Sequence, residues 1–97
     1  MSGIVYCLTN PSMPGYIKIG ITKNSLETRL KGLDTTSVPL PFECIFAIEV
    51  ENPKDAEKLL HDAFADNRVR STREFFQFEE QRVVSAIRLT GGNDVTP

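Results

Sequence analysis

Alternation of apolar and polar residues at the start of the chain predicts a β-hairpin. Residues 3–8 and 16–21 each read as a strand, and the Asn-Pro-Ser-Met-Pro-Gly run at 10–15 is typical of the turn between them. Residues two apart in a strand face the same side of a sheet, so the isoleucines of the second strand enter the core while Lys18 faces the other side. We therefore expect Lys18 on the open face of the sheet, where Tyr6 of the first strand can join it.

Apolar residues at helical spacing predict helices around a third strand. The capping-box spacing of Asn24 and Glu27 starts the first helix, whose leucines recur on one face until Gly32 and Asp34 help to end it. The later elements, in chain order, are a strand at 42–50, a helix that begins at Pro53, a last helix at 79–89 and a frayed tail at 91–97.

The whole pattern corresponds to one mixed α/β (α+β) domain over residues 1–90, with a flexible tail at 91–97. We expect a small antiparallel-based sheet of three strands, flanked by helices. An apolar stripe on the second helix and apolar anchors before the last helix would close the core. The stripe consists of Ala56, Leu59, Leu60, Ala63 and Phe64, and the anchors are Phe75, Phe76 and Phe78.

Composition limits the chain to one compact unit. Its 97 residues, 40% of them hydrophobic, can form a single core but leave no room for a separate DNA-reading domain. Cys7 and Cys44 lie in apolar runs. Two cysteines in a chain without a secretory leader favour reduced thiols in an intracellular protein. No apolar run approaches the ~20 residues that span a bilayer. We expect a soluble, cytoplasmic protein without a membrane partner.

The charge is unevenly distributed, although the whole chain carries only −2. Residues 1–33 have four basic residues and one acidic residue, a net charge of +3, whereas residues 34–66 have a net charge of −6. A local basic patch can hold a phosphate backbone even on an acidic molecule, with weak, salt-sensitive steering. The alternative is that these residues are ordinary solvated charges. The basic residues of the first segment are Lys18, Lys23, Arg29 and Lys31.

Two strand motifs followed by an arginine-bearing helix bring a phenol, an ammonium and a guanidinium toward one surface, a set suited to cutting a phosphodiester. The motifs are Ile4-Val5-Tyr6 and Lys18-Ile19-Gly20, and the helix carries Arg29. This arrangement resembles the GIY-YIG nuclease superfamily, in its small single-domain variant from phage and bacterial proteins. The resemblance covers nearly the whole chain, since Glu74 within Arg73-Glu74-Phe75-Phe76 matches that family's metal-binding carboxylate.

The resemblance implies a role for each motif residue. Tyr6 would accept the proton of the attacking water, and Arg29, about 60° from the leucine stripe of its helix, would clamp a phosphate. Lys18 stands where the second motif usually has a tyrosine; its ammonium can hold the scissile phosphate and favour the phenolate form of Tyr6, or Tyr16 can replace the missing phenol. The structural alternatives are a half-buried packing tyrosine and a surface arginine that covers the core edge.

Glu74 and His61 complete the expected catalytic set. Glu74 has no second carboxylate or histidine at ligand spacing, which favours one hard divalent cation, Mg²⁺ or Mn²⁺, held mostly by water and phosphate oxygens. Its alternative role is a surface ion pair with Arg70 or Arg73. His61 is the only histidine in the chain. It is expected either at a solvent edge or, as in similar proteins with a Leu-His pair, pointing to the site as a proton shuttle or phosphate contact.

The expected partner is DNA, bound by residues around the site. Arg68, Arg70 and Arg73 form a basic connector before Glu74, and Tyr16 and Lys23 are further candidates for substrate contacts. One short basic surface offers few phosphate contacts, which favours single-stranded or locally unpaired DNA. Exposed aromatic residues would stack on its bases, the candidates being Tyr16, Phe42 and Phe46.

Three other interpretations remain open from the sequence. The chain can be a catalytically inactive nucleic-acid-binding module, an acidic interaction protein that reuses the fold, or a nuclease that cuts duplex DNA as a dimer. The oligomeric state is open, with a monomer favoured.

Overall fold

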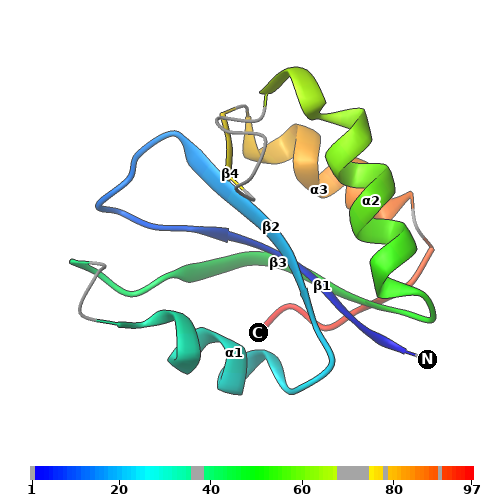
Figure 1. Cartoon of the computed structure of the whole chain (residues 1–97), viewed down its shortest axis with the longest axis horizontal. Coiled ribbons are helices and arrows are strands. Elements are labelled where there is room, and N and C mark those ends of the chain that lie inside the picture. The colour runs from blue at the N-terminus through cyan, green and yellow to red at the C-terminus, as the bar shows by residue number, and fades with distance from the viewer. Residues whose placement is uncertain (1, 36–38, 68–74, 78, 90) are drawn as a thin grey trace.

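The computed structural model describes residues 2–35, 39–67, 75–77, 79–89 and 91–97. Within them the chain has an α+β fold, in which one antiparallel sheet carries helices on both faces (Figure 1). The elements are β1 (Gly3–Thr9), β2 (Tyr16–Thr22), α1 (Leu26–Leu33), β3 (Glu43–Val50), α2 (Pro53–Ala63), a 3₁₀ turn (Ala65–Asn67), β4 (Phe75–Gln77), α3 (Glu80–Arg88) and β5 (Asn93–Asp94).

The sheet is wider than the sequence predicted. The hairpin of β1 and β2 and the strand β3 are confirmed, but the described strands follow the order β4-β2-β1-β3-β5, so a fourth strand and a two-residue fifth strand flank the three expected ones. The prediction of three strands was therefore wrong. Phe75 and Phe76 were read only as apolar anchors, whereas they lie in β4, whose partner is β2.

The register of the hairpin fixes which residues are neighbours on each face. Tyr6 of β1 lies opposite Gly20 of β2 and opposite Ala47 of β3. Lys18 lies opposite Leu8 and is therefore on the same face as Tyr6, as the alternation predicted.

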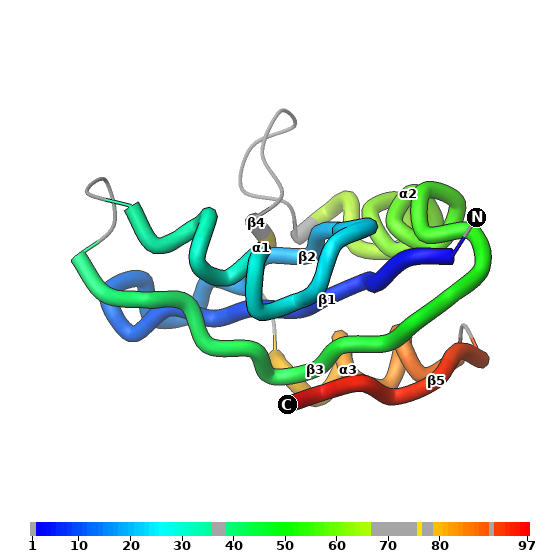
Figure 2. The backbone as a smooth tube through the Cα atoms, turned by 90° about the horizontal axis from the view of Figure 1, so that it is seen from below, coloured from blue at the N-terminus to red at the C-terminus, as the bar shows by residue number. Residues whose placement is uncertain are grey.

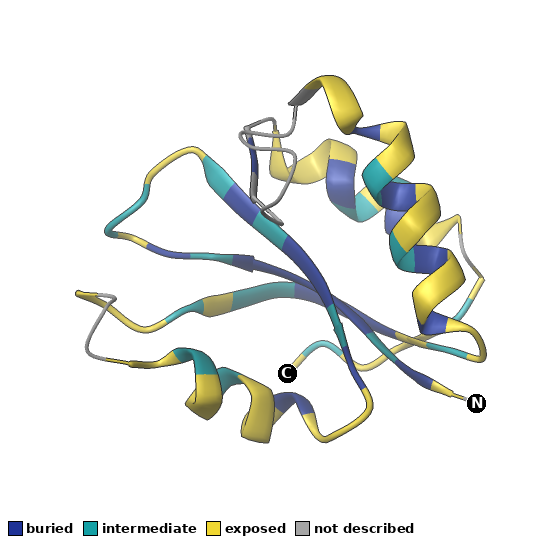
Figure 3. Cartoon of the chain, in the orientation of Figure 1, coloured by how far each residue is buried: buried dark blue, intermediate teal, exposed yellow. Residues whose placement is uncertain are grey.

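Both faces of the sheet are covered, because each carries its own cluster of buried side chains, whose residues are dark blue in Figure 3. One face packs against α2 and α3 and contains the larger core, including Val5, Ile19, Phe76 and Ile87. The other face packs against α1 and holds Tyr6 in a smaller core. The expectation of an open face at Tyr6 was therefore wrong, because the leucines of α1 cover it.

Local sequence explains how the helices begin. Ser25 caps α1, since its hydroxyl accepts a hydrogen bond from the Thr28 backbone N–H at 3.1 Å, so the cap lies one residue after the expected Asn24. Pro53 occupies the first turn of α2, where its missing N–H costs no hydrogen bond. None of the helices among the described residues is long and apolar enough to cross a membrane.

The apolar stripe of α2 is narrower than predicted. Ala56, Leu60 and Phe64 are buried against the sheet. Leu59 and Ala63, which were expected in the same stripe, are exposed. Helix α2 therefore faces the sheet along Ala56 and Leu60 and leaves Leu59 at the surface.

Residues 91–97 run beside β3 instead of forming the expected tail (Figure 2). Asn93 and Asp94 pair with Glu49 and Ile48, and the Thr96 hydroxyl accepts a hydrogen bond from the Ala47 N–H at 2.9 Å. Hydrogen bonds from the Thr96 hydroxyl and N–H lower the pKa of Asp94. The polar, glycine-containing sequence suggested fraying because it gave no sign of this pairing.

Candidate active site

Tyr6 is the most deeply buried of the predicted catalytic residues that the structure describes. It lies on the central strand β1 with 0% of its surface exposed. Its hydroxyl accepts a hydrogen bond from Nε of Arg29 at 2.9 Å, so the polar end of a buried ring is satisfied by a side chain from α1.

Gly20 creates the space that the Tyr6 hydroxyl occupies. A Cβ atom at residue 20 would lie only 2.6 Å from that hydroxyl and 2.7 Å from Cζ of the ring. The missing side chain on β2 thus lets the phenol lie across the neighbouring strand. Gly20 belongs to the second strand motif, but its role could not be predicted from the sequence because it depends on the residue opposite, Tyr6.

Arg29 connects this buried phenol to the surface. The residue is exposed, and its guanidinium carbon lies 5.9 Å from the centre of the Tyr6 ring. Its place on α1 agrees with the predicted boundary between core and solvent. A guanidinium has a planar array of donors suited to a phosphate.

Lys18 lies on the same face of the sheet as this pair. It is half-buried on β2, two residues before Gly20 and between Leu8 of β1 and Phe75 of β4 in the strand register. Diagonal neighbours on one face of a sheet are about 7–8 Å apart at their backbones, which is within the reach of a lysine side chain. The structure therefore brings a phenol, a guanidinium and an ammonium to one face.

His61 lies at the edge of β2. Its Nε2 is 3.2 Å from the Ile19 carbonyl oxygen, and its ring is 5.2 Å from the ring of Phe76. Because a carbonyl only accepts hydrogen bonds, Nε2 carries a proton and Nδ1 is the remaining nitrogen. The described contacts of His61 are therefore with Ile19 of β2, the residue after Lys18, and with Phe76 of β4.

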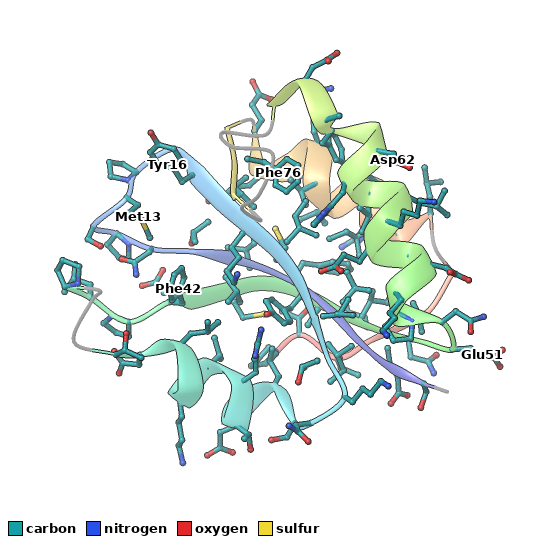
Figure 4. The ribbon with its side chains drawn as sticks, viewed as in Figure 1. Met13, Tyr16, Phe42, Glu51, Asp62 and Phe76 are labelled. Atoms are coloured by element: carbon teal, nitrogen blue, oxygen red, sulfur yellow. The ribbon has the colours of Figure 1, made fainter. Side chains whose placement is uncertain are left out.

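The proposed substrate-binding residues are spread more widely. Tyr16 is half-buried at the end of β2 next to the hairpin turn (Figure 4). Lys23 is exposed after the other end of β2, where it lines a cavity of about 270 Å³ with the first residues of α2. Glu74, Arg68, Arg70 and Arg73 lie outside the described residues.

Metal binding rests on the sequence alone. Among the residues that the structure describes, no group of three or more histidine, cysteine, aspartate or glutamate side chains could hold a metal ion. These residues therefore do not make a metal site by themselves.

The two cysteines have no part in the site. Cys7 is buried in the larger core and Cys44 is half-buried, and both thiols are free. Burial raises the pKa of both thiols, that of Cys7 most strongly. Neither has the electropositive, accessible surroundings of a nucleophilic thiolate.

The antiparallel sheet with its two strand motifs agrees with the GIY-YIG-like domain that the sequence resembles. The model of the T5orf172 domain family matches residues 3–91. The chain belongs to this GIY-YIG-like family. No curated protein and no solved structure matches it.

Proposed function

We propose that the chain is a metal-dependent DNA endonuclease that hydrolyses phosphodiester bonds at the Tyr6–Arg29 site. The observation that carries the proposal is the 2.9 Å hydrogen bond between Arg29 Nε and the Tyr6 hydroxyl. A hydrogen bond from a cation stabilises negative charge on the oxygen that accepts it. A tyrosine with such a partner is suited to accept a proton from water.

Arg29 would also control access to the base. Tyr6 is fully covered, so an attacking water reaches its hydroxyl only after a side chain moves. Arg29 is the exposed group bonded to that hydroxyl, and a substrate phosphate competes for the same guanidinium. Substrate binding would thus place the arginine on the phosphate and uncover the phenol in one movement.

In the reaction, Tyr6 in its phenolate form takes a proton from the water whose oxygen bonds to phosphorus. The bond from phosphorus to the 3′ oxygen breaks, and that oxygen takes up a proton from solvent. Arg29 and Lys18 stabilise the negative charge that grows on the nonbridging oxygens. His61, fixed through Nε2, has Nδ1 available for a phosphate contact or a proton. Glu74 would hold one divalent cation, Mg²⁺ or Mn²⁺, which when bound supplies charge stabilisation for phosphodiester cleavage.

Cleavage of labelled oligonucleotides, with Mg²⁺, with Mn²⁺ and with chelator, tests the activity. We expect cleavage only with a divalent cation. Glu74→Ala should abolish it while folding and much of the DNA binding remain, whereas Glu79→Ala, a nearby exposed carboxylate, is the matched control. Full cleavage by Glu74→Ala would refute the metal assignment.

We further propose that single-stranded or locally unpaired DNA is the preferred substrate. The chain is acidic overall, and among the described residues only Lys18 and Arg29 are basic groups at the site, whereas a duplex requires many phosphate contacts. Tyr16 and Phe42 are partly exposed and can stack on bases. The prediction that Phe46 also stacks on bases was wrong, because Phe46 is only 4% exposed. Faster initial cleavage of an annealed duplex than of the matched single strand, at equal salt, would refute this preference and favour a duplex-cutting dimer.

The full burial of Tyr6 also supports a second candidate, a nucleic-acid-binding module without catalysis. In that case the Arg29 contact only satisfies a packed phenol. Oligonucleotide binding with no cleavage under any metal condition would establish this alternative.

A further inference from the structure

A groove lies between the end of β3, the first half of α2 and the chain that follows α3. Its volume is about 660 Å³, and it shares no lining residue with the Tyr6–Arg29 site. Val50 and Ala56 contribute to its apolar lining. Leu59 of α2 and Leu89 at the end of α3 also line it. The volume is large enough for several side chains of a bound molecule.

The leucines of this groove are unusually exposed. Leu59 has 68% of its surface exposed and Leu89 has 88%. A single exposed leucine on a protein surface is ordinary, but two that line one groove with Val50 and Ala56 form an apolar patch. Neither leucine belongs to the core; Leu59 is turned away because α2 faces the sheet through Ala56 and Leu60, and Leu89 caps the end of α3.

The border of the groove is acidic. Glu49 and Glu51 line it and are exposed, and none of the described lining residues is basic. Within the described part of the chain, neither carboxylate has an ion-pair partner. They belong to the segment 34–66, which carries a net charge of −6.

We propose that this groove binds a segment of a basic partner protein, which inserts apolar side chains between Leu59 and Leu89 and places lysine or arginine beside Glu49 and Glu51. Protein interfaces usually have an apolar centre and a polar or charged border. The charge on the border favours a partner surface of the opposite charge. A symmetric pair of these chains fits less well, because two facing grooves would bring the four acidic side chains together. The inference does not depend on nuclease activity.

Peptide titration followed by ¹⁵N–¹H NMR tests the proposal. The probe is an amphipathic peptide of about 12 residues with leucines at helical spacing and lysines between them, compared with a peptide in which glutamate replaces every lysine. We expect amide shifts at Leu59, Gly91 and Gly92, and affinity for the lysine peptide at least about tenfold higher than for the glutamate peptide.

Two variants separate the apolar and the charged contributions. Leu59→Ser combined with Leu89→Ser should weaken lysine-peptide binding at least about tenfold, whereas Leu40→Ser, an exposed leucine outside the groove, should not. Glu49→Gln combined with Glu51→Gln should reduce the salt dependence of binding, and Glu43→Gln is the matched control. Dispersed NMR spectra of each variant establish that it is folded.

Several results would overturn the proposal. These are equal binding of the two peptides, amide shifts centred on Lys23 and Lys31 instead of on the groove, and unchanged binding by the double-leucine variant. Self-association in sedimentation experiments that the double-leucine variant abolishes would assign the groove to a second copy of the chain instead.

Discussion

The two faces of the sheet differ in how deeply they are covered. Among the described residues, twelve buried side chains form the core under α2 and α3, but only four form the core under α1. The thicker core is apolar apart from the thiol of Cys7, whereas the thinner core contains the phenol of Tyr6. Tyr6, Lys18 and Arg29 therefore lie on the face that, among the described elements, only the short helix α1 covers, so moving one exposed side chain there disturbs little packing. His61, by contrast, is carried by α2 and contacts residues of the larger core.

This contrast predicts that the two faces fail in different ways when they are mutated. On the α1 face, Tyr6→Phe keeps the packed ring and removes only the hydroxyl. We expect the cleavage rate to fall by a factor of about 10² to 10⁴, because general-base catalysis is lost, with a stability change of about 1 kcal/mol or less. Single-turnover cleavage and urea unfolding measure the two effects. An unchanged rate would transfer the base role to Tyr16 or His61.

The opposite result is expected on the α2/α3 face. Ile87 is 0% exposed in the larger core, and Ile87→Ala should lower the unfolding free energy by about 2–5 kcal/mol through lost burial and a cavity. The rate should stay near that of the unmodified protein at temperatures where the variant is folded. If Ile87→Ala lost activity while fully folded, the functional separation of the two faces would be wrong.

The sequence was a good guide to elements whose cause is local. Alternation predicted the hairpin and put Tyr6 and Lys18 on one face, and helical periodicity put Arg29 at the edge of α1. These features depend on residues a few positions apart, so they can be recognised without the rest of the fold.

Features that depend on distant pairing could not be predicted in the same way. The strands β4 and β5 are three and two residues long, too short for alternation to identify, and they exist because β2 and β3 offer them an edge. The exposure of Leu59 depends on how α2 is rotated against the sheet. The role of Gly20 becomes visible only when Tyr6 is known to lie opposite.

Gly20 offers a sharper test of the thin face. In Gly20→Ala the new methyl group would overlap the Tyr6 ring, which must shift at a cost of about 1–3 kcal/mol. We expect the cleavage rate to fall as well, because the hydroxyl leaves its place beside Arg29. Gly32→Ala in α1 is the control, since a Cβ there meets nothing within 4 Å and should be neutral or slightly stabilising.

A double variant distinguishes the steric cause from a general loss of stability. Combining Gly20→Ala with Tyr6→Leu should recover stability but not activity, because leucine has no ring to collide with the new methyl group. Failure to recover stability would mean that Gly20 is required for the backbone of β2 instead of for the phenol.

The two cysteines allow the smallest test of the difference between the faces, because the reactivity of each native thiol reports how often its own face opens. Cys7 lies in the larger core with 0% exposure, and Cys44 is half-buried beside the smaller core. Burial raises the pKa of both thiols, so little reactive thiolate exists at pH 8 in the folded protein. We expect a thiol reagent to label Cys44 slowly in the native state and Cys7 only on global unfolding.

Above about pH 8.5, where an unperturbed thiol ionises, the unfolded chain loses a proton that folded Cys7 retains. Folding stability should therefore decrease as the pH rises beyond that point, and Cys7→Ala should reduce this decrease. Measuring labelling by mass spectrometry in Cys44→Ala isolates Cys7. Labelling of Cys7 in that variant, at a rate well above global unfolding, would show that the thicker face opens locally and that the two faces are less different than their packing indicates.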